Sequence, residues 1–394
     1  MFNSRRIATT GGDKFRDDFS VAFDGSNDYI DCGDVSDWDF SNGSASIFSV
    51  SAWFRSADGS PGNNDTIISK YNTGDNQREW RISVDESARI KVFTSDNGTA
   101  TDSAHTSFTV TDTNWHHVVF TYDGSVATAG LRTTLYVDGV NHGITITSGT
   151  FPAILHEGNK LLTIGSFTSG GSPSANWDGS ISEVAIYNSA LSASQVKTLY
   201  NGREPYNHKE GIASGNLKAW YRMGDGAFDQ KSTDDSEGGI VTDMVTPTLG
   251  ADVLGGKGDF SDPSYWDIQT GESIVESGVG KWLGNGSYGH IKKDSILTAN
   301  QIYRVDLDVN SHNGSGNNSI ALNFTDPFIR IHTAGQTGHF TTYFKASNTN
   351  FVMYQAVDYD VVAEIDNVVV RPVNGNAGAM DNFADTTSFT GDTP

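Results

Sequence analysis

Hydrophobic and polar residues alternate in many short runs of the chain. In the first half, Trp80, Ile82 and Val84 alternate with Arg81 and Ser83. A period of two is typical of a β-strand with one packed face and one polar face. We therefore expect a strand here, with Arg81 and Ser83 on the wet side of a sheet.

The same alternation returns in the second half. Hydrophobic residues recur at every second position from Tyr303 to Val309 and again from Ile320 to Phe324. A glycine-rich gap at 313–318 separates the two runs, a spacing typical of a sandwich of short strands. The pattern predicts a second β-sandwich.

Turn and helix signals add detail to the first half. Asp138-Gly139 follows the strand pattern 133–137, and this pair favours a two-residue hairpin turn. Later, Ser192 followed by Gln195 has the layout of a capping box, with Leu191 as a hydrophobic staple. Asn201-Gly202 favours the left-handed backbone conformation that commonly ends a helix. One short helix is expected between them.

Composition agrees with an all-β chain. The 394 residues are 11% aromatic and 36% hydrophobic, with 43 glycines and 9 prolines, which suits short strands and tight turns. At about 150 residues per domain, the length indicates two to three domains. The formal charge of -22 argues against a general affinity for nucleic acid or for anionic membranes.

Cysteine usage and hydropathy narrow the class further. Cys32 is the one cysteine, so no disulfide can form within the chain, and no apolar run approaches the roughly 18 residues of a membrane-spanning helix. The first residues, MFNSRRIATTGG, lack the apolar segment of a secretory signal. Arg5, Arg6, Lys14 and Arg16 make residues 1–16 a basic arm, suited either to docking on an assembly partner or to no role at all.

Several segments of residues 17–226 resemble a laminin-G-like, concanavalin A-like lectin sandwich. The closing strand is WDGSISEVAIY at 177–187, followed by the short helix and by Asn201-Gly202. Its partners occur upstream in the expected order at 23–30, 48–54, 115–119 and 135–139. Residues 217–225, LKAWYRMGD, resemble the first strand of such a domain and are either a permuted edge strand of this sandwich or the start of a truncated repeat.

Residues 258–373 resemble the jelly-roll carbohydrate-binding modules of glycosidases and phage fibres. The matching pieces are Gly258-Asp259-Phe260 with Trp266, the segment 297–309, and Ile365-Asp366-Asn367-Val368. The expected fold class is therefore all-β, with two β-sandwich domains and one short helix closing the first. The remaining segments of the chain are a linker at 227–257 and a tail at 374–394. The tail is expected to be flexible or to be ordered by a neighbouring subunit.

The residues give no sign of catalysis. Glycosidases on the lectin sandwich commonly carry Glu-x-Asp-x-x-Glu on one strand, and this motif is missing. Glu183 has no carboxylate two residues on, so we interpret it as solvated or bonded to a turn. His116 and His117 point to opposite faces of a strand and cannot bind one metal ion together, so we expect one packed and one exposed histidine. The protein is expected not to be an enzyme.

Calcium is the cofactor that the two resemblances imply. In the first domain the candidate ligands are Asp75, in the loop 72–76, and Asp123. In the second they are Asp259 and Asp366. The alternative for each is an ordinary turn aspartate, because aspartate beside glycine or asparagine is typical of turns.

Sugar binding requires an exposed aromatic ring and nearby polar groups in one concave patch. Trp266, Trp282 and Tyr288 are the candidates, and the last two lie in the loop-like stretch 278–289. Packing in the core or at a subunit interface is the alternative.

A lectin-like fold in a chain without a secretory signal resembles the lectin-like structural proteins of tailed phages. It implies a non-catalytic virion surface protein, a capsid decoration or a fibre-like appendage, with other virion proteins and host surface glycans as partners. No nucleic-acid partner and no membrane insertion are expected. The protein is expected to form a homo-oligomer, with a trimer favoured. The alternative is a secreted or cell-surface carbohydrate-binding protein of a bacterium.

Overall fold

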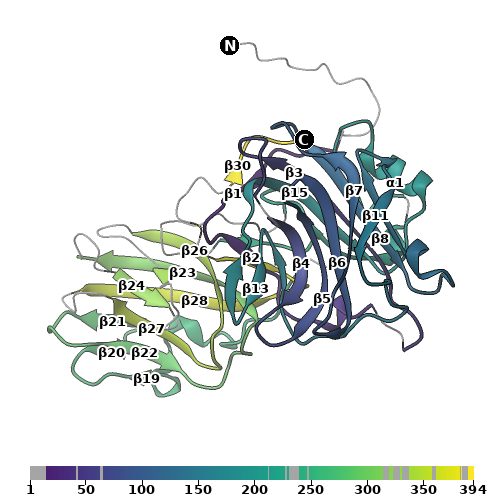
Figure 1. Cartoon of the computed structure of the whole chain (residues 1–394). Helices are drawn as coiled ribbons and strands as arrows, with labels where there is room; N and C mark the ends of the chain where they lie inside the picture. Colours follow the sequence, from purple (N-terminus) through teal and green to yellow (C-terminus); the bar gives the residue numbers. More distant parts are fainter. Residues whose placement is uncertain are drawn as a thin grey trace, which may run out of the picture.

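The computed structural model describes residues 15–40, 43–62, 65–211, 213–226, 229, 239–245, 248–313, 319–322, 329–330, 337–356, 361–381, 383 and 389–394. Most of the basic arm, including Arg5, Arg6 and Lys14, lies outside the described residues, as does Phe324. None of the described helices is long and apolar enough to cross a membrane. The fold is all-β, as the sequence predicts, and consists of two sandwiches placed end to end (Figure 1).

The first sandwich packs an eight-stranded sheet against an eleven-stranded sheet. The eight-stranded sheet contains β1 (Ser20–Asp24), β3 (Ile47–Ser56), β8 (His116–Asp123), β9 (Thr133–Val137), β10 (Val140–Asn141), β15 (Asp178–Tyr187), β16 (Leu217–Tyr221) and β30 (Phe389–Thr390). The eleven-stranded sheet contains β2 (Tyr29–Asp31), β4 (Thr66–Asn72), β5 (Gln77–Val84), β6 (Arg89–Gly98), β7 (Asp102–Thr109), β11 (Ile144–Ser148), β12 (Leu162–Ile164), β13 (Phe167–Ser169), β14 (Ser172–Ser174), β17 (Ile240–Val241) and β29 (Gly378–Asp381).

The second sandwich is smaller and packs a six-stranded sheet against a five-stranded sheet. The six-stranded sheet contains β18 (Thr248–Leu249), β20 (Ser273–Glu276), β21 (Val279–Leu283), β23 (Ile302–His312), β26 (Gly338–Lys345) and β28 (Val362–Asn374). The five-stranded sheet contains β19 (Asp267–Ile268), β22 (His290–Lys293), β24 (Ser319–Leu322), β25 (Ile329–Arg330) and β27 (Phe351–Ala356).

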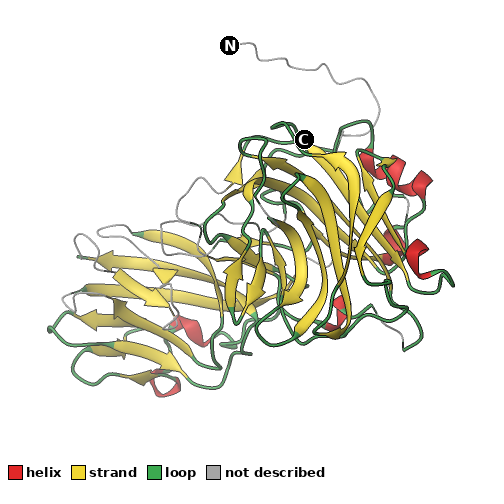
Figure 2. Cartoon of the chain, in the orientation of Figure 1, coloured by secondary structure: helices red, strands yellow, loops and turns green. Residues whose placement is uncertain are grey.

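The described helices are short (Figure 2). They are α1 (Ala193–Tyr200) and the 3-10 turns η1 (Ser36–Trp38), η2 (Ala129–Leu131), η3 (Ser214–Asn216), η4 (Lys257–Asp259) and η5 (Pro263–Tyr265). Helix α1 begins with the predicted capping box of Ser192 and Gln195 and ends at Asn201, which is left-handed with φ 48°. Its apolar side, with Val196 and Leu199, packs on the outer face of the eight-stranded sheet.

Local patterns explain the cores. Trp80, Ile82 and Val84 are fully buried between the two sheets of the first sandwich, as their alternation predicts. The run from Tyr303 to Val309 likewise turns its alternate apolar residues into the core of the second sandwich. Asp138 and Gly139 both have positive φ, 52° and 74°, and close the predicted hairpin between β9 and β10.

Strand β16 belongs to the first sandwich. It pairs antiparallel with β15, from Val184 opposite Tyr221 to Tyr187 opposite Leu217. This is the permuted edge strand, the first of the two alternatives that the sequence left open.

The linker and the tail differ from the expectation. Within the linker 227–257, β17 pairs with β29 of the tail in the eleven-stranded sheet, and β18 pairs with β28 in the second sandwich. Tail strand β29 also pairs with β2, and β30 pairs with β1. The described strands of the tail are therefore paired within their own chain, because the open edges of β2 and β1 offer unpaired backbone groups to them.

The two sandwiches meet through an apolar cluster and an ion pair. The cluster joins Ile240 of β17 to Ile302, Tyr343 and Val373 of the second sandwich. Beside it, Lys345 of β26 forms an ion pair with Asp31 of β2. Together with β17 and β29, these contacts fix the second sandwich to one end of the eleven-stranded sheet.

Candidate functional site

A polar row crosses the outer face of the eleven-stranded sheet. Strand register places Thr163, Ser69, Arg81, Phe93 and Ser103 directly opposite one another on five successive strands, β12, β4, β5, β6 and β7. Because side chains alternate along a strand, this row points away from the core that Trp80 and Ile82 fill. Figure 1 shows β4, β5 and β6 side by side, with β13 next to β4.

Arg81, at the centre of this row, lies among three aromatic rings. Its guanidinium carbon lies 4.1 Å from the ring centre of Phe93, 4.6 Å from that of Phe167 and 4.9 Å from that of Tyr71. Tyr71 is buried, whereas Phe93 and Phe167 are half-buried. Phe167 comes from β13, which runs parallel to β4. We call Arg81 and these three rings the arginine cage.

Arg81 has neither a carboxylate nor a hydrogen-bond partner among the described residues. Only 5% of its surface is exposed, and its Nε is fully enclosed. Burial lowers the pKa of Arg81 to about 10, so the side chain remains a cation at neutral pH. A buried charge is normally paired, and cation–π contacts at about 0.5–2 kcal/mol each offset only part of its desolvation. The cage therefore holds a positive charge whose counter-charge the described chain does not supply.

Neighbouring positions extend this polar surface. Lys91 lies on β6 two residues before Phe93, and its Nζ is 4.7 Å from the Phe93 ring centre. Register places Lys91 opposite Ser83 and His105, on the same outer face as the cage. The Ser83 hydroxyl is buried and has no partner in the described part of the chain. The sequence predicted a wet face for Arg81 and Ser83; both are buried instead, because the rings of the cage and the adjacent strands enclose them.

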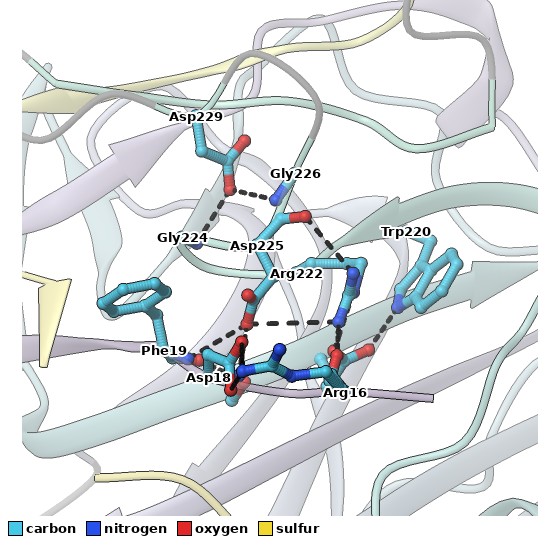
Figure 3. Close-up of polar contacts among 11 residues, drawn as sticks. Arg16, Asp18, Phe19, Trp220, Arg222, Gly224, Asp225, Gly226 and Asp229 are labelled. Atoms are coloured by element: carbon cyan, nitrogen blue, oxygen red, sulfur yellow. Dashed lines mark hydrogen bonds and ion pairs between the residues drawn. The ribbon is translucent and has the colours of Figure 1, made fainter. Parts of the chain in front are cut away.

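A second arginine cluster lies on the outer face of the other sheet, where the N-terminal segment packs against it. Arg222 donates from Nε to Glu183 at 3.2 Å and from Nη1 to the Asp225 carbonyl at 3.2 Å, and Nη2 donates to the Arg16 carbonyl. Figure 3 shows Arg222 reaching from Asp225 to Arg16, with Trp220 beside it. Its guanidinium also stacks on Phe15 at 4.4 Å. We call this group the Arg222 cluster.

Glu183 is fully buried in the Arg222 cluster, which corrects its interpretation as a solvated residue. It lies at a β-bulge, where Glu183 and Val184 of β15 oppose Ala52 alone, and its φ is 51°. Trp220 Nε1 donates to one of its oxygens and Arg222 to the other. Burial raises the pKa of Glu183 to about 7, although Arg222 opposes the shift.

Asp17 completes the Arg222 cluster. It lies beside Glu183, and burial, followed by the charge of Glu183, raises the pKa of Asp17 to about 10. Both of its oxygens are buried and have no hydrogen-bond partner among the described residues, so the carboxyl is neutral at pH 7. Asp225 accepts the backbone N–H groups of Asp18 and Phe19 at 2.7 and 3.0 Å. These bonds tie the segment 15–19 to the sandwich.

The first sandwich has the fold of a known superfamily. Residues 24–197 match the Laminin_G_3 family, described as the concanavalin A-like lectin/glucanases superfamily. A comparison with the curated proteins found no match.

Solved structures that are similar to part of this chain share little sequence with it. The heptameric SAP-like pentraxin of Limulus polyphemus is 16% identical over 47% of this chain and 82% of its own, with a TM-score of 0.36. The CBM40 of the Ruminococcus gnavus IT-sialidase is 12% identical over 46% of this chain and 97% of its own, with a TM-score of 0.35. Domain 4 of the arabinanase AbnA of Geobacillus stearothermophilus is 18% identical over 46% of this chain and 76% of its own, with a TM-score of 0.31. Nothing about the function of this chain follows from these similarities.

The tryptophans predicted to bind sugar are buried in the second sandwich. Trp282 is fully buried and donates its indole N–H to the Gly289 carbonyl at 3.2 Å. Trp266 is 6% exposed and packs on Phe260. Neither can offer a ring face to a sugar, so both belong to the core, the alternative that the sequence left open. Tyr288 is half-buried beside Tyr354, 6.0 Å between ring centres, and lies apart from the arginine cage on the other sandwich.

The predicted calcium ligands are bonded to other groups of the chain. Asp75 pairs with Lys160 at 2.9 Å, and an ammonium group there competes with a cation. Asp123 accepts the Ser125 N–H and hydroxyl, and Asp259 does the same for Ser261. Asp366 bonds to the N–H of Asn367.

No group of three or more histidine, cysteine, aspartate or glutamate side chains within the described ranges could hold a metal ion. The four aspartates therefore fit turn chemistry and do not fit a calcium site built from these residues. We derive no role for calcium from them.

The two histidines of β8 point to opposite faces, as predicted, but both are buried. His117 packs against Trp53 and bonds to Ser51, and burial lowers its pKa to about 4. His116 lies between Asp138 and Asp112; burial alone would lower its pKa, but these two carboxylates raise it. Both histidines are structural.

Sequence reasoning missed the arginine cage because its rings are dispersed along the chain. Phe93 lies 12 positions after Arg81 and Phe167 a further 74. A usable signal was present in the strand 77–84, where a long cation, Arg81, lies between the apolar residues Trp80 and Ile82.

Proposed function

We propose that the protein is a non-catalytic glycan-binding protein and that its first sandwich binds sugar at the arginine cage. The observation that carries the proposal is Arg81, a buried cation held by three rings and left without a counter-charge by the described residues. The match of residues 24–197 to a lectin superfamily supports it.

The chemistry of the cage suits a sugar. Half-buried Phe93 and Phe167 offer ring surface for the C–H face of a pyranose, and Arg81 and Lys91 supply hydrogen-bond donors beside them. Serine side chains continue the polar row on both sides, at Ser69 and Ser103. Apolar rings with a few polar groups around them are typical of small-ligand sites.

The carboxylates of the first sandwich support a non-catalytic role. Retaining glycosidases hold two carboxyl groups about 5 Å apart with the substrate between them. Asp17 instead lies directly beside Glu183, and Glu183 is fully enclosed. Such a pair has no room for a glycosidic bond.

A glycan array with the purified full-length protein tests this function. We expect binding to a defined set of sugars, and we expect Phe93→Ala to weaken that binding while Tyr288→Ala leaves it unchanged. Absence of binding to every glycan, with the protein shown to be folded, would contradict the proposal.

We also propose, more narrowly, that the protein is a surface component of a phage particle, a capsid decoration or an appendage, and forms a homo-oligomer there. The resemblance of the two sandwiches, in this order, to lectin-like structural proteins of tailed phages supports this. A density gradient of lysate from the source culture tests it: the chain should band with DNA-containing particles. Banding with the cell envelope, or recovery from the medium as free protein, would favour a bacterial carbohydrate-binding protein instead.

A further inference from the structure

We infer that the ligand of the arginine cage is an acidic sugar, whose carboxylate or sulfate group pairs with Arg81. This inference rests on the proposed glycan-binding function and names the chemical class of the glycan. Three features of the described residues carry it: an unpaired buried guanidinium, a second cation beside it, and ring surface next to both.

The charge distribution is the first argument. The chain has 48 acidic against 26 basic residues, so a basic side chain has many potential carboxylate partners. Lys70 illustrates this, since its ammonium group contacts Asp34, Asp39 and Glu79. Arg81 and Lys91 form no ion pair within the described ranges. Two unpaired cations on one face of so acidic a protein mark a place from which carboxylates are excluded.

The geometry is the second argument. Arg81 is directly opposite Phe93 in the register, and Lys91 is two residues along the partner strand, a diagonal neighbour at a Cα distance of about 7–8 Å. Both cations contact the ring of Phe93. Like charges this close repel each other, and an anion bound between them removes the repulsion.

The shape of an acidic sugar matches these contacts. A guanidinium binds a carboxylate or a sulfate through two parallel hydrogen bonds, which a neutral hydroxyl group cannot reproduce. The pyranose ring that carries the acid would then lie over Phe167 or Phe93. Because the charge of the whole chain is -22, an extended polyanion is repelled, so the site favours a single acidic residue at the end of a glycan or within a short one.

Binding and stability should respond to Arg81 in opposite directions. A ligand-binding charge that lacks a partner in the free protein costs stability, and a neutral side chain of similar length removes that cost. We therefore expect Arg81→Met to unfold at the same temperature as the wild type or at a higher one. A purely structural arginine would give the reverse result, because its ring contacts would be lost.

The test is a glycan array that carries each glycan in neutral, carboxylated and sulfated forms, applied to the full-length wild type, Arg81→Met, Arg81→Lys and Lys197→Met. Lys197→Met removes one positive charge from the exposed side of α1, on the opposite face of the sandwich, and is the matched control. We expect the wild type to prefer acidic forms at least 10-fold, and we expect Arg81→Met to lose that preference. Arg81→Lys should retain part of it, and Lys197→Met all of it. Which acidic form binds decides between carboxylate and sulfate.

Two outcomes would overturn the inference. The first is wild-type binding to neutral glycans with no preference for acidic forms, which would leave the glycan-binding function intact. The second is an acidic preference that survives in Arg81→Met while this variant unfolds at a clearly lower temperature, which would make Arg81 structural. Absence of any glycan binding by the folded wild type would instead contradict the proposed function itself, and the inference with it.

Discussion

Arg81 and Arg222 both stack on aromatic rings in the first sandwich, yet their surroundings differ. Arg222 reaches Glu183 and the carbonyls of Asp225 and Arg16, so its charge and its donors are used within the chain. Arg81 has three rings and no described acceptor. Similar packing of the same side chain thus serves two purposes. A fully bonded arginine holds a segment in place, whereas an unbonded one is available to a ligand.

The largest expected effect concerns stability at the Arg222 cluster. Arg222→Met leaves the buried Glu183 without its counter-charge, and loss of one partner of a buried pair costs about 3–5 kcal/mol. We expect the urea midpoint of the first sandwich to fall accordingly, while Arg81→Met changes it little or raises it. Equal losses in the two variants would break the distinction between the two arginines.

The next effect concerns affinity at the arginine cage. Phe167→Ala removes a half-buried ring from β13, and an aromatic contact is worth about 0.5–1.5 kcal/mol beyond its area. We expect the affinity for the best glycan to fall up to about 10-fold, as measured by calorimetry. Phe15→Ala removes the ring over Arg222 and is the matched control; a comparable loss of affinity there would place the sugar at the other arginine.

A smaller effect follows from the raised pKa of Asp17. The pKa of Asp17 is about 10 in the folded protein and 3.8 without its surroundings, so above pH 3.8 the folded state binds more protons than the unfolded chain. Its contribution to stability is therefore complete at low pH and is lost as the pH rises towards 10.

The amide of Asp17→Asn cannot lose a proton, so this variant should match the wild type near pH 4 and unfold about 4 °C higher at pH 9, by scanning calorimetry. Exposed Asp18→Asn should follow the wild type throughout. Equal unfolding temperatures of the wild type and Asp17→Asn at both pH 4 and pH 9 would show that Asp17 is ionised in the fold with an ordinary pKa.

The smallest expected effect is that of metal removal. The predicted ligands are bonded to turns or to lysine: Asp75, Asp123, Asp259 and Asp366. We therefore expect a chelator to change neither glycan affinity nor the unfolding temperature. A loss of binding that calcium restores would show that a metal site exists and that these turns were wrongly interpreted.

The sequence predicted those features that depend on neighbours along the chain. The alternation at 80–84, the Asp138-Gly139 turn and the Ser192 capping box each concern residues within a few positions of one another, and all are present. The strand at 217–221 was also predictable, since its resemblance to the first strand of laminin-G-like domains identified it and only its partner was open.

Features that depend on distant pairing were not predictable. Tail strand β29 is short and its composition is unremarkable, yet the edge of β2 binds it. Glu183 is buried because a bulge turns it under Trp220, and no residue near it in sequence indicates this. Trp282 illustrates the converse error, because a tryptophan in a glycine-rich stretch suggested a loop whereas it fills the core from β21. The arginine cage combines β4, β5, β6 and β13, which only the sheet register brings together.

The most direct test of this account is a crystal structure of the wild-type protein with the best-binding acidic glycan. The account predicts the acid group within hydrogen-bonding distance of the Arg81 guanidinium, with a sugar ring against Phe93 or Phe167. A glycan bound on the second sandwich, or one whose acid group points to solvent while Arg81 remains unpaired, would contradict it.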